Sequence, residues 1–152
     1  MKTTEFLEQR QVPFEVIRHP ESSNALRLAR TLNVPDDQVA KTVLLKADGG
    51  YTWIVAVLPA SKHVEMDRLS KALGYCRLEL AEEGEISQHC PETEKGVLPP
   101  FGLEYCMKTV VDESLADKPC IYFEGDTHSE AIRMSFADFC RIEQPLKLSF
   151  AG

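Results

Sequence analysis

The sequence predicts an α+β fold, a single compact domain over residues 1–152 in which helices flank a mixed, mostly antiparallel β-sheet. Two observations support this prediction. With 152 residues, of which 43% are hydrophobic, the chain suits one domain that buries roughly two thirds of its unfolded surface. Helical and extended patterns alternate irregularly, and the clearest strand pair is a tight hairpin, which favours α+β over a doubly wound fold.

The first elements follow from apolar periodicity and from one proline. Residues 3–11 have the apolar spacing of a short amphipathic helix. Residues 14–19 alternate as a strand that ends before Pro20, because the residue preceding a proline avoids helical angles. A serine at position 22 or 23 is expected to cap the next helix, which runs through Leu32.

The hairpin is the most strongly predicted element. Residues 39–46 and 51–58 are rich in the apolar and β-branched side chains that suit a pleated surface, and Asp48-Gly49-Gly50 supplies a turn between them. Pro59 ends the second strand. These two strands should therefore pair along their length.

The remaining elements are shorter. A helix over 65–73 stops at Gly74, which suits a left-handed C-terminal cap. A short strand over 76–80 and a short helix over 82–88 follow. The last predicted elements are strands at 110–111, 120–123 and 131–134 and a helical turn near 136–140.

Composition excludes several function classes. The formal net charge of −7 argues against a broad basic face for nucleic acid, so any such contact is local and DNA is not an expected partner. No apolar run approaches a membrane span, and Met1-Lys2-Thr3-Thr4-Glu5 lacks the apolar core of a signal peptide, so a cytoplasmic protein is expected. The five cysteines form no C-x-x-C pair, so no metal site, disulfide framework or cofactor is predicted.

The loop Gly96-Val97-Leu98-Pro99-Pro100-Phe101-Gly102 is the first candidate site. Its glycines accept unusual backbone angles and its prolines stiffen it, so a ligand can approach the backbone. The N–H groups of Val97, Leu98, Phe101 and Gly102 are expected to be free to bind a carbonyl oxygen or a phosphate. The alternative is that the loop is only a tight connection.

Single side chains add to this candidate site. Strand alternation places Lys41 on the same face as Val43 and Leu45, where an amine must snorkel, form an ion pair or bind an anion. Thr42 offers a hydroxyl on the opposite face. His128 lies in a polar turn between two strands, which suits either a binding side chain or a solvated histidine.

Four segments in register resemble the YbaK-type family of editing domains associated with prolyl-tRNA synthetase. They are Ala40-Lys41-Thr42-Val43-Leu44-Leu45, Val57-Leu58-Pro59-Ala60-Ser61-Lys62-His63-Val64, the Gly96–Gly102 loop, and Gly125-Asp126-Thr127-His128-Ser129-Glu130-Ala131-Ile132-Arg133-Met134. The similarity extends over about residues 15 to 142. Many members carry G-G-x-S-P-x-G in the loop, whereas this chain has Val97 and Pro99 and so resembles the double-proline branch.

The resemblance implies a deacylase that hydrolyses the ester of a mischarged tRNA carrying a small amino acid, with no metal and no covalent nucleophile. It assigns Lys41 to the terminal nucleotide and the ester, and it makes Gly96, Val97, Leu98 and Gly102 the backbone of the catalytic loop. The implied partners are the acceptor end of an aminoacyl-tRNA and an aminoacyl-tRNA synthetase. The hypothesised substrate-binding groups are His19, Ser22, Asn24, Thr42, Pro99, Pro100, Phe101 and His128.

Two other functional hypotheses depend on the same residues. One is a non-catalytic regulatory module whose pocket binds a nucleotide or another small anionic ligand. The other is a hydrolase of a different aminoacyl or peptidyl ester. The sequence keeps Lys41 and the loop, which favours a freestanding aminoacyl-tRNA deacylase, but a retained pocket does not by itself exclude a binding module.

Overall fold

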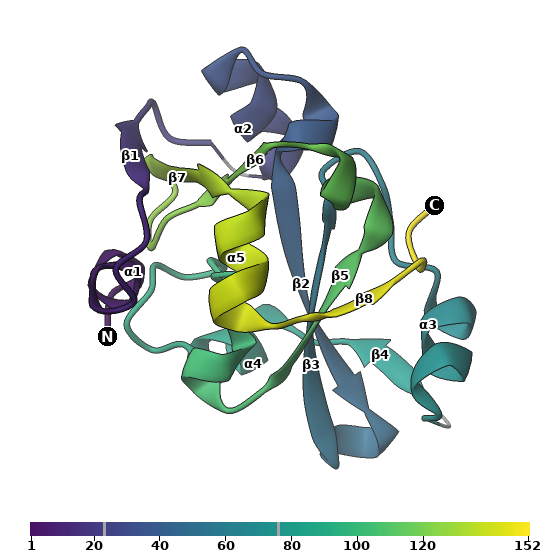
Figure 1. Cartoon of the computed structure of the whole chain (residues 1–152). Coiled ribbons are helices and arrows are strands. Elements are labelled where there is room, and N and C mark those ends of the chain that lie inside the picture. The colour runs from purple at the N-terminus through teal and green to yellow at the C-terminus, as the bar shows by residue number, and fades with distance from the viewer. Residues whose placement is uncertain (23, 76) are drawn as a thin grey trace.

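A computed structural model of the chain describes residues 1–22, 24–75 and 77–152 (Figure 1). The strands within these ranges are β1 (Glu15–Arg18), β2 (Ala40–Ala47), β3 (Thr52–Pro59), β4 (Leu78–Leu80), β5 (Lys108–Asp112), β6 (Cys120–Glu124), β7 (Glu130–Ser135) and β8 (Leu146–Leu148). The α-helices are α1 (Thr3–Gln9), α2 (Ala25–Leu32), α3 (Met66–Leu73), α4 (Glu83–His89) and α5 (Phe136–Glu143).

The larger sheet has five strands in the order β4-β2-β3-β5-β8. Its centre is the predicted hairpin, in which β2 and β3 pair antiparallel from Ala40↔Pro59 to Ala47↔Thr52. β4 is also antiparallel to β2, whereas β5 runs parallel to both β3 and β8. The sheet is therefore mixed.

The smaller sheet has three antiparallel strands in the order β1-β7-β6. An isolated parallel bridge joins Val39, just before β2, to Tyr122 in β6. This contact brings the beginning of β2 beside the three-stranded sheet. As a result, Lys41 lies near the turn that follows β6.

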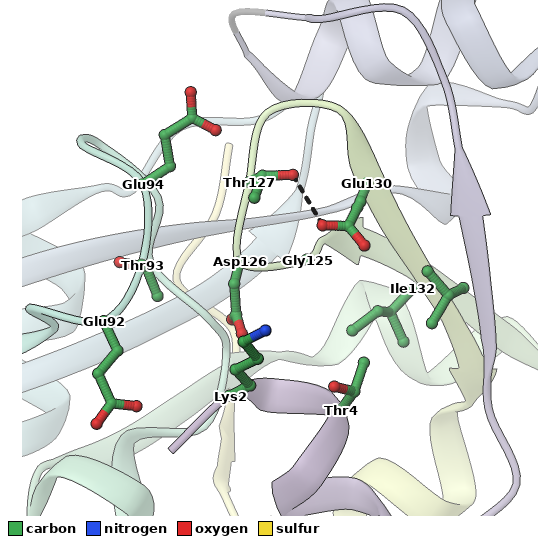
Figure 2. A pocket seen from close by; sticks show the side chains of 11 residues that line it. Lys2, Thr4, Glu92, Thr93, Glu94, Gly125, Asp126, Thr127, Glu130 and Ile132 are labelled. Carbon is green, nitrogen blue, oxygen red and sulfur yellow. Dashed lines mark hydrogen bonds between the residues drawn. The ribbon is translucent and has the colours of Figure 1, made fainter.

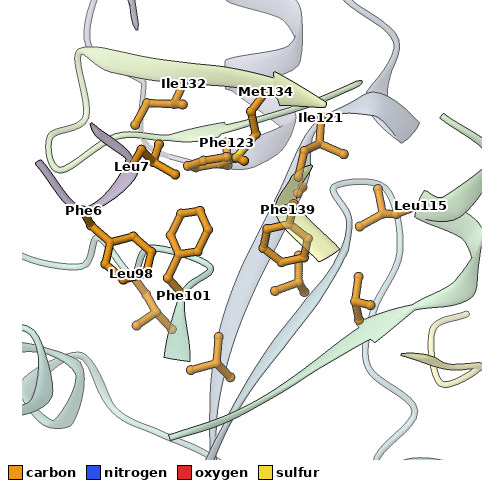
Figure 3. Packing of buried hydrophobic residues seen from close by; sticks show 14 of the residues in the cluster. Phe6, Leu7, Leu98, Phe101, Leu115, Ile121, Phe123, Ile132, Met134 and Phe139 are labelled. Carbon is orange, nitrogen blue, oxygen red and sulfur yellow. The ribbon is translucent and has the colours of Figure 1, made fainter. Parts of the chain in front are cut away.

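The main core lies between the two sheets. Apolar side chains from one face of the larger sheet meet side chains of the smaller sheet, α1 and α5 (Figure 3). Phe101 is central to this core, with ring centroids 5.2 Å from Phe6, 5.6 Å from Phe123 and 5.6 Å from Phe139. The opposite face of the larger sheet packs against α3 through Leu69.

The predicted α+β class is confirmed, but the strands divide into two sheets. Alternation along β2 is also confirmed, because Leu44 belongs to the main core while Val43 and Leu45 belong to the core beneath α3. The strand β8 was missed because Leu146-Lys147-Leu148 is too short to show a period. Within the described ranges, no helix combines the length and the apolar character needed to cross a membrane.

The predicted cap of the second helix is corrected. The helix begins one residue after Asn24, whose side chain accepts a hydrogen bond of 2.9 Å from the Arg27 N–H. Ser22 lies before this cap and is 4% exposed. Ser23, the other serine expected to cap, lies outside the described residues. Asn24, and not Ser22, is the cap because its side-chain oxygen accepts the N–H of the third helical residue, as a good N-cap does.

Candidate functional site

A cavity of about 200 Å³ lies where four segments distant in the sequence meet. The start of α2, the start of β2, the Gly96–Gly102 loop and the turn after β6 each contribute to it. Its lining residues are Asn24, Ala25, Leu28, Ala40, Lys41, Thr42, Gly96, Leu98, Glu124 and His128. Six of them, Asn24, Lys41, Thr42, Gly96, Leu98 and His128, are residues that the sequence singled out.

Lys41 supplies a positive charge to this cavity. Its amine donates a hydrogen bond to the Lys62 carbonyl, in the loop that follows β3. Partial burial removes water from the amine and lowers the pKa of Lys41 from its usual value. A lysine held by one neutral acceptor keeps two further N–H donors, so it can still bind an anion.

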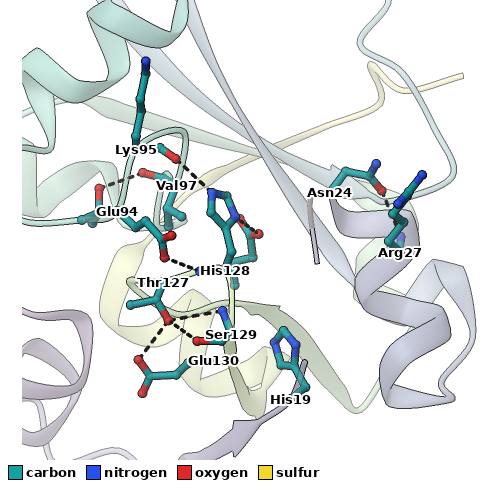
Figure 4. Close-up of polar contacts among 12 residues, drawn as sticks. His19, Asn24, Arg27, Glu94, Lys95, Val97, Thr127, His128, Ser129 and Glu130 are labelled. Atoms are coloured by element: carbon teal, nitrogen blue, oxygen red, sulfur yellow. Dashed lines mark hydrogen bonds and ion pairs between the residues drawn. The ribbon is translucent and has the colours of Figure 1, made fainter. Parts of the chain in front are cut away.

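His128 is fixed by three hydrogen bonds (Figure 4). Its backbone N–H donates to Glu94 at 2.9 Å, its Nδ1 lies 3.0 Å from Glu124 Oε1, and its Nε2 lies 2.9 Å from the Lys95 carbonyl. A carbonyl only accepts, so Nε2 carries a proton. With Glu124 ionised, Nδ1 donates as well and the ring is a cation.

The surroundings of this imidazole favour the charged form. Burial acts to lower the pKa of His128, but the hydrogen bonds to Glu124 and to the Lys95 carbonyl, together with the charges of Glu124 and Glu94, raise it overall. Burial raises the pKa of the Glu124 carboxyl, and the contact with His128 opposes that rise. Burial and the contact with His128 therefore act in opposite directions on the pKa of Glu124.

The Gly96–Gly102 loop is rigid, but it is less open than the sequence predicted. Gly96 has a φ of 84°, which favours glycine, and a Cβ there would lie 3.0 Å from Glu83 Oε1. The N–H of Val97 donates to the Glu94 carbonyl at 3.0 Å, and that of Gly102 donates to the Thr109 hydroxyl at 3.0 Å. The expectation that these two groups are free is wrong, because the loop uses them to hold its own shape.

Among the described residues, the N–H groups of Leu98 and Phe101 have no hydrogen-bond partner. Leu98 lines the cavity, whereas Phe101 is fully buried in the aromatic core. Apart from Gly96 and Leu98, the residues of the loop pack away from the cavity. Val97, Pro99, Pro100, Phe101 and Gly102 are all buried and do not line the cavity.

The remaining predicted residues lie behind or beside the cavity. Ser22 donates its backbone N–H to the His128 carbonyl at 3.0 Å, and its buried hydroxyl has no partner among the described residues. His19 donates its backbone N–H to Ser129 at 3.0 Å and lines a separate hollow with Thr127. Both therefore support the turn that carries His128, and neither lines the cavity.

Glu124 is the main functional candidate that sequence reasoning missed. It ends β6, lines the cavity and contacts His128 four residues later. An acidic residue four positions before a histidine across a tight turn is the signal that could have identified it. Ala25, Leu28 and Ala40 were also missed, because small and apolar residues carry no chemical signature.

An outer hollow of about 560 Å³ adjoins the cavity and shares Gly96 and His128 with it. Two basic side chains, Arg27 and Lys95, line this hollow, together with Glu21 and Glu83. A ligand with one end in the inner cavity can therefore extend outward past a mixed, partly basic surface.

A second large cavity, of about 520 Å³, is made of different residues (Figure 2). Its lining includes the carboxylates Glu92, Glu94, Asp126 and Glu130, against the single amine of Lys2. Such a surface repels phosphate groups. This cavity is therefore a poor site for a nucleic-acid end.

The cysteines and histidines that the structure describes do not gather into a ligand set. Across residues 1–22, 24–75 and 77–152, no group of three or more His, Cys, Asp or Glu side chains is placed to hold a metal ion. Burial raises the pKa of the Cys90 thiol to about 11, so it is protonated at neutral pH and is not a nucleophile.

Comparisons with known proteins identify the family of this chain. The model of the aminoacyl-tRNA editing domain family matches residues 19–142. The proline–tRNA ligase of Leuconostoc citreum (strain KM20) is 33% identical over 106 residues, which are 69% of this chain but only 18% of the ligase.

Solved structures share the fold. The crystal structure of a hypothetical protein superposes with a TM-score of 0.90 at 18% identity and covers 100% of both chains. A proposed trans-editing enzyme for prolyl tRNA synthetase superposes with a TM-score of 0.82 at 17% identity, over 96% of this chain and 92% of that chain. The chain belongs to the aminoacyl-tRNA editing domain family.

Proposed function

We propose that this chain is a freestanding trans-editing deacylase that hydrolyses the ester of a tRNA mischarged with a small amino acid. The observation that carries the proposal is the joint cavity, in which Lys41, Thr42, Asn24, Leu98 and His128 meet although they come from four distant segments. Family membership makes an aminoacyl ester the substrate to test first.

We assign different parts of the substrate to the two hollows according to their volumes. The inner cavity of about 200 Å³ is smaller than the roughly 300 Å³ at the lower end of small-ligand pockets, so it suits an aminoacyl group rather than a nucleotide. Leu28, Ala25 and Ala40 provide an apolar wall for a short side chain. The outer hollow of about 560 Å³, with Arg27 and Lys95, takes the terminal nucleotide.

The proposed chemistry is ester hydrolysis without a covalent enzyme intermediate. A water molecule adds to the ester carbonyl carbon, the carbon–oxygen bond to the ribose breaks, and the ribose oxygen leaves with a proton as a hydroxyl group. An aminoacyl ester is already activated, so orientation and stabilisation of the oxyanion supply most of the rate. The Leu98 N–H and the Lys41 amine are the proposed oxyanion and phosphate donors.

The net charge of the protein is consistent with binding only the acceptor end of a tRNA. A protein with a net charge of −7 binds a long stretch of tRNA poorly, but contact with the acceptor end alone needs few phosphates neutralised. The proposed partners are therefore the acceptor end of an aminoacyl-tRNA and a synthetase that releases it.

The test is deacylation of a panel of tRNAs charged with labelled amino acids. We expect release from one mischarged pair, and a loss of at least about a hundredfold in kcat/KM in Lys41→Ala, as for removal of one oxyanion donor. Lys46→Ala is the matched control, because Lys46 lies on the same strand but binds Glu85 at 3.1 Å, outside the cavity. It should retain the wild-type rate.

Two outcomes would contradict the deacylase proposal. If folded wild-type protein releases no amino acid from any pair, or if Lys41→Ala is fully active, the proposal is wrong. Ligand-detected NMR then separates the alternatives. A preference for a bare nucleotide over an aminoacyl-adenosine analogue would indicate the non-catalytic regulatory module.

A further inference from the structure

Glu124 is the carboxylate of the inner cavity. Of the ten described lining residues, it alone carries a carboxyl group, and Lys41 alone carries an amine. The Glu124 side chain is 20% exposed, so it is partly withdrawn from water while still reaching the cavity. A buried charge of this kind needs a partner of opposite sign.

Only one side of this carboxylate is occupied by a described residue. Oε1 contacts His128 Nδ1 at 3.0 Å, while Oε2 has no hydrogen-bond partner among the described residues. A carboxylate offers about four lone-pair positions, so a second donor can bind at Oε2 without displacing His128. Because Glu124 lines the cavity, a ligand there can reach the carboxylate.

Lys41 does not fill that position. Its amine is directed to the Lys62 carbonyl, and no ion pair joins Lys41 to Glu124. Two groups of opposite charge therefore line one small cavity without neutralising each other. This arrangement fits a ligand that carries a cationic and an anionic group at its two ends.

The local charge also remains negative when His128 is protonated. Glu94 binds the His128 backbone N–H at 2.9 Å, and Glu124 binds its ring. Two carboxylates around one imidazolium leave one net negative charge. Glu94, His128 and Glu124 therefore keep a net negative charge beside the end of β6 even when the histidine is protonated.

We infer that Glu124 binds the α-ammonium group of the aminoacyl ester, so that the site accepts esters with a free amino group and rejects N-acylated ones such as peptidyl esters. The inference rests on the proposed function and narrows its substrate class. The ammonium group donates to Glu124 Oε2, and the apolar wall receives the side chain. N-acylation removes the positive charge and adds bulk in a cavity of about 200 Å³.

The experiment measures hydrolysis of one aminoacyl-tRNA in two forms. In one form the α-amino group of the amino acid is free, and in the other it is N-acetylated. For wild-type protein we expect kcat/KM to be at least about tenfold higher for the free amino group, the equivalent of about 1.4 kcal/mol. Glu124→Gln removes the charge but keeps an acceptor for His128. It should lower kcat/KM for the free form at least about tenfold and leave the N-acetyl rate unchanged, so the preference is lost.

Glu130→Gln is the matched control. Glu130 begins β7 on the same hairpin, accepts a hydrogen bond of 3.1 Å from Thr127 and lies outside the inner cavity. The glutamine keeps that acceptor, so the preference for the free amino group should not change. A merely structural effect of losing a carboxylate from this hairpin would lower both rates together.

The outcomes separate the two proposals. If wild-type protein hydrolyses both forms equally, or if folded Glu124→Gln keeps the wild-type preference, the role of Glu124 is wrong while the deacylase proposal stands. If wild-type protein hydrolyses neither form of any aminoacyl-tRNA, the deacylase proposal fails and the role of Glu124 fails with it.

Discussion

The Thr109 hydroxyl donates a hydrogen bond of 2.5 Å to the buried carboxyl group of Glu143. The same hydroxyl accepts the Gly102 N–H at 3.0 Å, and Glu143 also accepts the Leu103 N–H at 3.1 Å. Through this network, β5 and the end of α5 hold the C-terminal end of the Gly96–Gly102 loop. The shape of the candidate site thus depends on polar groups that do not line it.

Glycine at position 102 should be required for this contact. A Cβ at position 102 would overlap the Thr109 hydroxyl and would lie 2.8 Å from the Met107 carbonyl, so the backbone must move. We expect Gly102→Ala to lower the free energy of unfolding by about 1–3 kcal/mol, as overpacking does. Chemical denaturation measures the change.

Gly84→Ala is the control for this substitution. Gly84 lies in α4, and a Cβ there would meet no atom within 4 Å. Alanine should therefore stabilise the protein by about 0.5–1 kcal/mol through helix propensity. Equal effects of the two substitutions would contradict the proposed packing of Gly102.

The buried carboxyl of Glu143 should make stability depend on pH. Burial raises its pKa from the usual 4.5 to about 7, and hydrogen bonds from Thr109 and Leu103 only partly oppose the rise. Between these pH values Glu143 binds more protons in the folded state than in the unfolded state, so its contribution to stability is fully present below about pH 4.5 and falls as pH rises toward 7.

Glu143→Gln should reduce this dependence. The amide cannot ionise, so the decrease in the free energy of unfolding between pH 4.5 and 7 should become smaller by up to about 3 kcal/mol. Urea denaturation of both proteins at several pH values tests this. Glu104, whose pKa burial also raises to about 7, remains in both proteins, so their difference isolates Glu143. Parallel pH profiles would show that Glu143 is not responsible.

Asn24 should have two separable roles. As the N-cap of α2 it accepts the Arg27 N–H at 2.9 Å, and it also lines the candidate cavity. Asn24→Ala should cost about 1 kcal/mol of stability. Asn24→Asp keeps the cap and places a negative charge at the N-terminus of a helix, so stability should be retained.

The same aspartate would place a negative charge in the cavity where the oxyanion of the substrate is proposed to form. We therefore expect Asn24→Asp to lower deacylation by about fivefold or more, which corresponds to roughly 1 kcal/mol of repulsion. Thermal unfolding and kcat/KM, measured on the same preparations, separate the two roles. Full activity in Asn24→Asp would limit Asn24 to its capping role.

Much of the fold could be predicted from the sequence because its signals are local. Periodicity and a glycine turn identified the β2–β3 hairpin, and alternation placed Lys41 on the face shared with Val43 and Leu45. The Leu146–Leu148 strand was missed since three residues carry no period and parallel pairing with β5 is a long-range contact.

The sequence by itself determined which segments are candidates for the site, because a strand lysine, a glycine-bounded loop and a turn histidine are recognisable one at a time. Only the tertiary structure decided that Lys41, Leu98, Glu124 and His128 line one cavity, and that the Val97 and Gly102 N–H groups are already used inside the protein. The physical reason is distance along the chain. Packing of two sheets and the hydrogen bonds between remote residues set these contacts, and no short-range pattern encodes them.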